Sequence, residues 1–276
     1  MQVFPRTLAS AALSLLLLAA AAPAALAQDE AESEQPEYVV LSTAEVSPPN
    51  IDAFTEIVAE FRQLAMDAGI GADFRWDVYS RDNEFVLVSW RETMATFDDP
   101  QAFMRQFEGE YAERLPEIFQ RMEDVEATWV TSVLRPRQDW SYQPAEVPFA
   151  EGQQGGVFVF SQWPGRASEE EFAASAENLI GFIDEVGYAY PLYAFQVMLG
   201  DEHVEFVVAF DTPAGFYGEN SLGTLVEGAG RMDEWEGLVD AHNQLLADTD
   251  SQVLFYRPEL SYRPDLQVAS AGGDGG

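Results

Sequence analysis

The sequence contains no cysteine and no lysine, and only two histidines among its 276 residues. Without cysteine it can form no disulfide, thiol nucleophile, thiolate metal site or lipoprotein attachment. All 14 basic residues are arginines, and against 48 acidic residues they leave a formal net charge of −34. Because such a surface repels phosphate backbones, we expect no nucleic-acid partner. The acids are spread along the chain, which favours a surface suited to a salty medium over a specific cation-binding role.

The first 27 residues have the pattern of a cleaved export signal. Arg6 carries the one charge, an apolar run is densest at 15–22, and the segment ends in Ala25-Leu26-Ala27, the small-x-small pattern of a cleavage site. The alternative, a membrane anchor, is disfavoured because the run is short and Pro23 interrupts it. We therefore expect cleavage after Ala27, a periplasmic or secreted location, and no membrane insertion after cleavage.

The rest of the chain contains one pattern twice. Amphipathic stretches begin at Phe54 and Phe172 and stop at Gly69 and Gly187, and both pairs are separated by 118 residues. Further matches follow at offsets of 120 to 122, namely Glu84-Phe85-Val86 with Glu205-Phe206-Val207, Arg135-Pro136 with Arg257-Pro258, and Ser141-Tyr142-x-Pro144 with Ser261-Tyr262-x-Pro264. An internal duplication explains such steady offsets better than coincidence.

Each copy predicts the order strand, helix, strand, strand, helix, strand, which is the ferredoxin-like order. Strands are expected at 38–43, 74–79, 84–90 and 128–134, and again at 157–163, 190–198, 204–210 and 252–256. Helices are expected at 50–68, 101–123, 168–186 and 222–246, and the Gly-rich stretch 215–230 is expected to be a mobile lid or an irregular helix start. The predicted segments are a signal peptide (1–27), an acidic flexible tail (28–37), repeat 1 (38–136), a linker (137–156), repeat 2 (157–264) and a second flexible tail (265–276).

This tandem arrangement resembles the dimeric α+β barrel superfamily, which includes antibiotic-biosynthesis monooxygenases, EthD-like and NIPSNAP-like proteins, and chlorite dismutase-like haem proteins. The resemblance covers residues 38–264 and rests on element order, duplication and aromatic strands. It implies an α+β fold in which two ferredoxin-like repeats close into an intramolecular barrel with the helices outside. No catalytic motif accompanies it, so it assigns no catalytic residue. Closure is also expected physically, because the strands are largely apolar on both faces.

The lumen of such a barrel is the expected ligand site. Arg75, Asp77 and Tyr79 alternate along one strand and share a face, where they could hold a polar ligand group or accept a proton. The alternative, favoured by general burial statistics, is that this face meets solvent. The hypothetical lumen set is completed by Trp129, Gln196 and His242. The strand tryptophans Trp76, Trp90, Trp129 and Trp163 would form an aromatic wall for a ligand or, as more often, pack in the core.

The two histidines offer few catalytic possibilities. His242 lies on an apolar helical stripe with Trp235, Val239 and Leu246. We expect a hydrogen-bonded core histidine and no cofactor, with haem ligation by His242 as the alternative. His203, beside Asp201, is expected in a turn. The sequence contains no zinc, P-loop, dinucleotide or nucleophile-elbow motif.

Three hypotheses remain. The first is an exported protein that binds a small, largely apolar molecule in its lumen. The second is a cofactor-independent monooxygenase-like or isomerase-like enzyme that uses Asp77, Tyr79 or His242 as a proton carrier. The third is a ligand-free scaffold. The sequence leaves the ligand, the reaction and the oligomeric state open.

Overall fold

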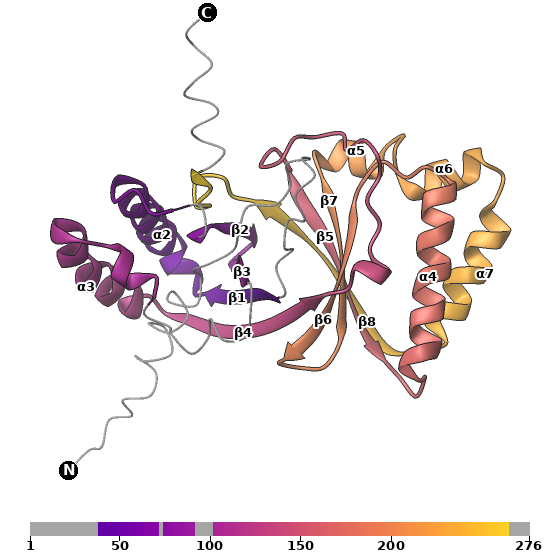
Figure 1. Ribbon diagram of the computed structural model, residues 1–276, viewed down its shortest axis with the longest axis horizontal. Coiled ribbons are helices and arrows are strands. Elements are labelled where there is room, and N and C mark those ends of the chain that lie inside the picture. The colour runs from indigo at the N-terminus through magenta and orange to yellow at the C-terminus, as the bar shows by residue number, and fades with distance from the viewer. Residues whose placement is uncertain (1–37, 72–73, 92–101, 265–276) are drawn as a thin grey trace, which may run out of the picture. The chain divides into compact units, whose positions relative to one another are not determined.

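The computed structural model describes residues 38–71, 74–91 and 102–264 (Figure 1). The predicted signal peptide and both predicted tails lie outside these residues. The chain divides into two compact units. Unit 1 comprises the described residues up to Val133 together with those from Arg257 onward, and unit 2 comprises Leu134–Tyr256. Within the described residues, no helix has the length and apolar character needed to cross a bilayer.

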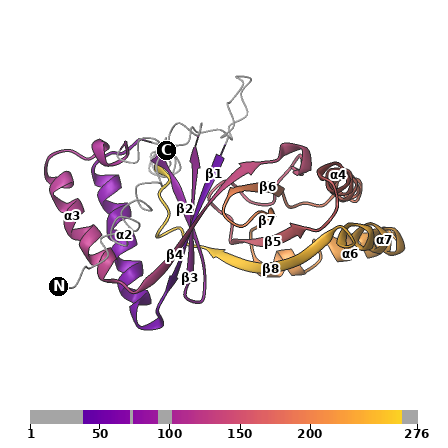
Figure 2. The same cartoon turned by 90° about the horizontal axis from the view of Figure 1, so that it is seen from below.

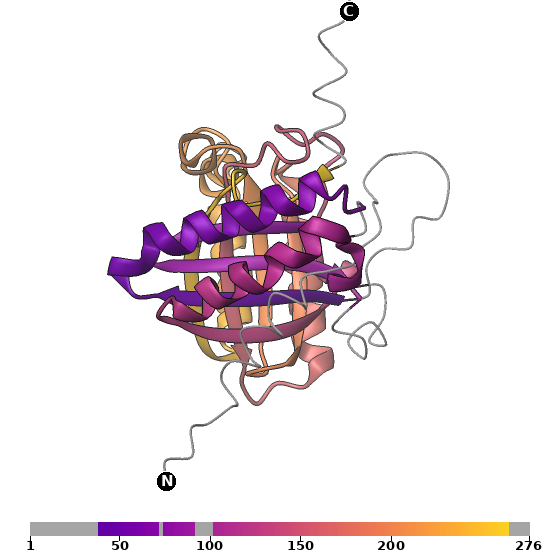
Figure 3. The same ribbon diagram turned by 90° about the vertical axis from the view of Figure 1, so that its left-hand side faces the viewer.

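Unit 1 is an antiparallel sheet with helices on one face. Strand β3 (Glu84–Arg91) pairs with β1 (Tyr38–Val46) on one side and with β2 (Trp76–Arg81) on the other. Helices α2 (Ile51–Asp67) and α3 (Gly109–Asp124) lie across these strands (Figure 3). The 3-10 turns η1 (Pro48–Asn50) and η4 (Met104–Gln106) precede them, and β4 (Ala127–Pro136) follows α3.

An aromatic core joins these helices to the sheet. Phe61 on α2 lies 5.5 Å from the ring of Trp76 on β2 and 5.7 Å from Phe103. Phe54, about two helical turns earlier on α2, lies 4.8 Å from Phe85 on β3. All five side chains are almost fully buried, so the periodic aromatic positions of α2 determine which sheet face it covers.

Unit 2 repeats the arrangement of a sheet with helices on one face. Strand β5 (Gly156–Pro164) pairs with β7 (Val204–Phe210) and β8 (Leu246–Tyr256), and β6 (Leu192–Leu199) pairs with the other edge of β7. Helix α4 (Glu169–Glu185) packs beside α7 (Met232–Asn243), and the short α5 (Pro213–Tyr217) and α6 (Leu222–Gly228) connect β7 to α7 (Figure 2). The strand and helix order of an α+β protein is therefore confirmed.

The two matched helices end in the same backbone motif. Gly69 and Gly187 have φ angles of 66° and 70°, which favour glycine. The amide of the next residue reaches back into the helix in both cases, from Ile70 to the Ala65 carbonyl and from Tyr188 to the Ile183 carbonyl. These paired bonds form the helix-ending motif that the 118-residue offset predicted.

A second repeated motif follows β4 and β8. We call residues 137–142 clasp 1, which belongs to unit 2, and residues 257–262 clasp 2, which belongs to unit 1. Each clasp begins with an arginine whose amide donates to a strand carbonyl, Arg137 to Ala194 and Arg257 to Val78. Each then folds back, because the serine four residues later donates its hydroxyl to the arginine carbonyl.

The clasps also end alike. The tyrosines form antiparallel bridges, Tyr142 with Leu192 and Tyr262 with Trp76. Each tyrosine hydroxyl donates to the carbonyl of the residue just after the helix-ending glycine, Tyr142 to Tyr188 at 2.7 Å and Tyr262 to Ile70. The two clasps therefore correspond at a constant offset of 120 residues.

This correspondence corrects the predicted alignment of the copies. Arg135-Pro136 was matched with Arg257-Pro258, but Arg137 makes the contacts that Arg257 makes. Nor is 137–156 only a linker, because clasp 1 is built into unit 2. The compact units also differ from the predicted repeats, since the strand that ends each repeat leads into a clasp of the other unit.

Several element bounds differ from those expected. Strand β2 begins at Trp76, two residues late, so Arg75 precedes it. Strand β8 begins at Leu246, six residues early, because its exposed polar residues pair with the end of β5 around Trp163. The predicted helix at 222–246 is two helices, separated at Gly230, whose φ angle is 66°. Helix α3 begins at Gly109, later than expected. Helices α5 and α6 in the Gly-rich stretch start at side-chain caps from Thr212 and Ser221.

Candidate functional site

The sheet of unit 1 has two distinct faces. Trp76 and Val78 on β2 point into the helix-covered core. Asp77 and Tyr79 alternate with them and therefore lie on the opposite face. On that face Asp77 is paired with Val88 and Tyr79 with Val86, both on β3. We call this surface the open face of unit 1, meaning the sheet face that its helices do not cover.

A buried ion pair lies on the open face. Arg263, which directly follows clasp 2, donates its Nε–H to Oδ1 of Asp77 at 2.6 Å and a terminal N–H to Oδ2. Asp77 is 1% exposed and Arg263 8%. The bond is therefore bidentate, the geometry in which arginine fixes a carboxylate most firmly. Both oxygens of Asp77 have defined directions.

A second arginine and a tryptophan lie next to this pair. The guanidinium carbon of Arg75 is 4.8 Å from the ring centroid of Trp90 on β3, and that of Arg263 is 5.9 Å from the same ring. Both distances lie within the range of a cation–π interaction. Arg75 is 7% exposed and Tyr79 8%. The open face thus combines charged groups with one aromatic surface.

The remainder of the open face is apolar. The registers place Val39 and Leu41 of β1 opposite Trp90 and Val88 of β3 on this side of the sheet. Val39 is buried, whereas Leu41 and Val88 are partly exposed. A mostly apolar surface with a few fixed polar groups has the composition of a small-molecule site. The alternative in which this face meets solvent, with Arg75 and Asp77 as ordinary surface charges, is wrong, because Arg75, Asp77 and Tyr79 are all buried.

The structure does not bring the other predicted lumen residues to an open face. Trp129 on β4 packs against the helix-side core of unit 1, with its ring 5.9 Å from Phe54. Gln196 lies opposite Val204 in the β6–β7 pair, on the side that faces the helices of unit 2. His242 lies on α7 and contacts Phe172 of α4. Of the six predicted lumen residues, the structure thus places Asp77 and Tyr79 on the sheet face away from the helices, and Trp129, Gln196 and His242 on the helix side.

His242 is a buried, fully hydrogen-bonded histidine. Its Nδ1 lies 3.0 Å from Ser175 Oγ, and its Nε2 lies 2.8 Å from Gln162 Oε1. Because an amide oxygen only accepts, Nε2 carries the proton, and Ser175 donates to Nδ1. Burial lowers the pKa of His242, which keeps the ring neutral. The prediction of a hydrogen-bonded core histidine is confirmed.

These contacts decide how well the chain suits haem. His203, the other histidine, has Nδ1 2.6 Å from the Asp201 carbonyl and Nε2 2.8 Å from Glu205. Both histidines therefore use both ring nitrogens inside unit 2, and the chain has no cysteine. The residues present do not fit a histidine- or thiolate-ligated haem. Among the described residues, no group of three or more carboxylate or imidazole side chains is arranged to hold a metal ion.

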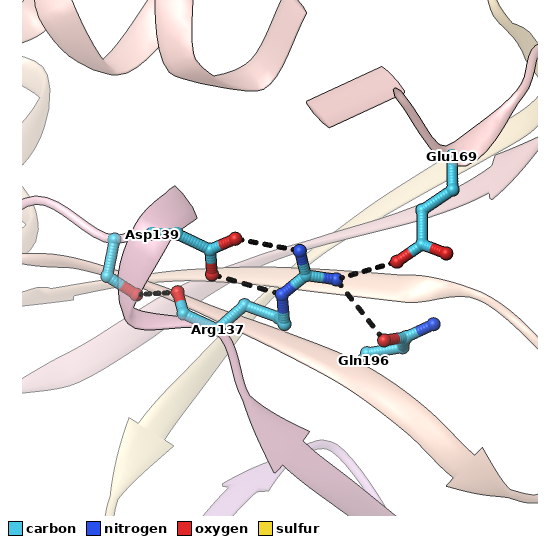
Figure 4. A network of polar contacts seen from close by, with 5 residues as sticks. Arg137, Asp139, Glu169 and Gln196 are labelled. Carbon is cyan, nitrogen blue, oxygen red and sulfur yellow. Dashed lines mark hydrogen bonds and ion pairs between the residues drawn. The ribbon is translucent and has the colours of Figure 1, made fainter. Parts of the chain in front are cut away.

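A polar network surrounds Gln196 in unit 2 (Figure 4). Arg137 donates to both oxygens of Asp139 at 3.0 and 2.7 Å, and one terminal nitrogen reaches Glu169 at 3.4 Å and Gln196 at 3.3 Å. Its guanidinium carbon is 3.4 Å from the ring centroid of Trp140. The Arg137 hydrogen bond lowers the pKa of Asp139, and that carboxylate raises the pKa of Arg137. Gln196 thus helps to fix clasp 1.

Comparison with known proteins identifies the fold. No protein-family model matches the sequence, and no curated protein does. Solved structures do match. A "putative monooxygenase" of Lactobacillus acidophilus NCFM has a TM-score of 0.50 at 7% identity, covering 83% of this chain and 97% of that one. One of the same name from Fusobacterium nucleatum subsp. nucleatum has a TM-score of 0.52 at 6% identity, with 80% and 93% covered.

A chlorite dismutase of Candidatus Nitrospira defluvii matches with a TM-score of 0.43 at 12% identity, covering 80% of this chain and 91% of that one. The two structures with TM-scores of 0.50 and 0.52 show that this chain has a similar fold, and at these identities they show the fold alone.

Sequence reasoning missed two residues of the site. Arg263 is the variable residue of the Ser-Tyr-x-Pro motif, and the other copy has Gln143 there. That difference between otherwise matched motifs was the available signal. Trp90 was noticed only as one of several strand tryptophans. Its contact with Arg263, 173 residues further along the chain, is one that no local pattern shows.

Proposed function

We propose that this protein binds a small, largely apolar molecule on the open face of unit 1, with the polar end of the molecule at Arg75, Asp77 and Arg263. The buried bidentate pair of Asp77 and Arg263 is the observation that carries this proposal. A buried ion pair stabilises a fold no better than apolar residues of similar size would. Its position among valines and a tryptophan therefore supports a role in recognition.

The geometry favours binding over acid–base catalysis. A general base needs an oxygen aimed at the substrate proton. Both oxygens of Asp77 already accept hydrogen bonds from Arg263. His242, another predicted proton carrier, is enclosed by Ser175 and Gln162. In the monooxygenase-like alternative, which the names of the structural neighbours suggest, neither Asp77 nor His242 is therefore positioned as a base.

The proposal includes the finer architecture. We propose that the two copies are ferredoxin-like repeats whose sheets close into an intramolecular barrel, with the open face of unit 1 directed to the lumen. Support comes from the equal element order, the matched helix ends and the matched clasps. A closed lumen would give the apolar part of the ligand the enclosure that small-molecule sites have. An exported protein would meet such a ligand outside the cytoplasm.

The test has two parts. Protein purified from its native host is analysed by native mass spectrometry for a co-purifying molecule, and the emptied protein is titrated with the fluorescent dye ANS. ANS suits the proposed site, because it has an aromatic body and one anionic group. We expect saturable, one-to-one binding whose dissociation constant Asp77→Asn changes at least tenfold, because the substitution releases Arg263 from its carboxylate partner.

Asp52→Asn is the matched control, since Asp52 is an exposed carboxylate at the start of α2. Circular dichroism of each variant checks that it is folded. Absence of both a co-purifying molecule and saturable dye binding by the folded wild type would refute the proposal and favour the scaffold hypothesis. Equal binding by Asp77→Asn and Asp52→Asn would place the ligand elsewhere.

A further inference from the structure

His203 lies where the β6–β7 hairpin meets β5. Its ring stacks on the indole of Trp163 with centroids 4.8 Å apart and planes inclined by 24°. The indole Nε1–H of Trp163 donates to Oδ2 of Asp201 in the hairpin turn at 2.9 Å. The backbone carbonyl of His203 accepts from the Val197 amide at 3.0 Å, which closes the hairpin. His203 thus contacts β6 through its backbone carbonyl and β5 through its ring.

Both ring nitrogens of His203 face acceptors that have no proton to give. Nδ1 points at the backbone carbonyl of Asp201, and Nε2 points at a carboxylate oxygen of Glu205. Each contact needs an N–H, so the arrangement is complete only when the ring carries both protons. His242 differs in this respect, because a hydroxyl donates to its second nitrogen. The two histidines therefore have opposite protonation requirements.

The surroundings of His203 are acidic. Its side chain is 12% exposed and that of Glu205 13%. Glu205 also accepts from Ser161 of β5 at 3.1 Å. The β5–β8 register places Asp248 opposite Trp163 and Asp250 opposite Ser161, on the same side of the sheet. Among the described residues of β5, β7 and β8 on this side, none is basic, so these strands supply no positive group to balance their carboxylates.

We propose that His203 is a proton-dependent latch that holds the β6–β7 hairpin against Trp163 of β5. When the ring loses its proton, one of its two acceptors loses its donor. The stack on Trp163 also loses its cationic character. The Glu205 carboxylate then remains largely buried beside further acids, which is unfavourable. The hairpin, whose tip carries the exposed Met198 and Leu199, opens as a result.

The direction of the effect follows from the pKa of His203. Burial alone lowers this pKa, but the hydrogen bonds to Glu205 and Asp201 outweigh it and raise the pKa above its usual value. A raised pKa means that the latch is fully closed below the unfolded value of about 6.5 and weakens as the pH rises through the folded value. The latch therefore opens on the alkaline side.

The test uses the whole protein with 13C-labelled histidine, which gives two imidazole signals in an NMR titration. His242→Gln identifies the His203 signal. We expect His203 to titrate above the midpoint of a histidine peptide and His242 below it. Hydrogen exchange of the hairpin amides, corrected for the intrinsic rate, should accelerate by up to about tenfold per pH unit between the pKa of a histidine peptide and the folded-state pKa of His203.

Variants separate the latch from a general effect of pH. Glu205→Gln should lower the His203 midpoint and move the onset of hairpin exchange with it. Glu202→Gln, which removes an exposed acid from the same turn, should change neither. A wild-type His203 that titrates at or below the peptide value overturns the latch. The latch is also overturned if the corrected exchange rate of the hairpin amides does not change across the pH range in which His203 titrates. Because the latch lies in unit 2, either result leaves the proposed ligand site of unit 1 unaffected.

Discussion

The ion pair between Asp77 and Arg263 provides the sharpest test of how unit 1 is built. Asp77→Asn removes one charge from a pair in which neither member is more than 8% exposed. The guanidinium of Arg263 is then buried without its carboxylate. Breaking a buried pair in this way costs about 3–5 kcal/mol, so we expect the free energy of unfolding to fall by that amount. Arg263→Met should cost a similar amount, because it leaves the carboxylate alone.

The double variant Asp77→Leu/Arg263→Met should behave differently. With both charges replaced by apolar groups, the desolvation cost disappears, and the stability should return to within about 1 kcal/mol of wild type or exceed it by about 1–4 kcal/mol. Urea denaturation followed by circular dichroism measures all three variants. The exposed pair Arg81–Glu84 is the control, with side chains 44% and 25% exposed. Glu84→Gln should cost no more than about 1 kcal/mol.

Two results would refute this reasoning. Single variants that cost less than about 1 kcal/mol would show that the pair is not desolvated in solution. A double variant as unstable as the single ones would show that the pair itself stabilises unit 1. A stable double variant that no longer binds ANS would instead separate the two roles. The pair would then serve recognition, and the apolar strands would supply stability.

Three further predictions concern His242, the two helix-ending glycines and the two clasp tyrosines. The pKa of His242 is lowered in the folded state, so its contribution to stability is present above about pH 6.5 and is lost as the pH falls. The free energy of unfolding, measured over a range of acidic pH, should show this loss in wild type but not in His242→Gln. Gly69→Ala and Gly187→Ala should each cost about 1–2 kcal/mol in thermal or urea unfolding, because a side chain is strained at positive φ and nothing lies within 4 Å to clash or to compensate. Tyr142→Phe and Tyr262→Phe should each cost about 1–3 kcal/mol by leaving a buried carbonyl without its donor, and markedly unequal losses would contradict the equivalence of the clasps.

Local patterns in the sequence were enough to predict most of the strands and helices. The 118-residue spacing of Phe54 and Phe172, and of Gly69 and Gly187, predicted two helices with the same ending, because the apolar period and the glycine requirement act within a few residues. Alternation along the predicted strand 74–79 likewise put Arg75, Asp77 and Tyr79 on one face, and β2, which begins at Trp76, contains the last two. The strand start at Leu246 was missed because exposed polar residues such as Asp248 and Asp250 have little strand preference of their own. They adopt the extended conformation by pairing with β5.

The sequence by itself determined the acidic, cysteine-free character of the protein, the recurrence of its motifs at offsets of 118 to 122 residues, and the common face of Asp77 and Tyr79. Composition and short-range periodicity are properties of the chain, so they can be determined without knowledge of the fold. Only the tertiary structure decided that the carboxylate of Asp77 meets Arg263, that Trp129, Gln196 and His242 face helices, and that His203 needs two protons. Each of these depends on a contact between segments far apart in the chain, where packing and hydrogen-bond geometry choose the partner.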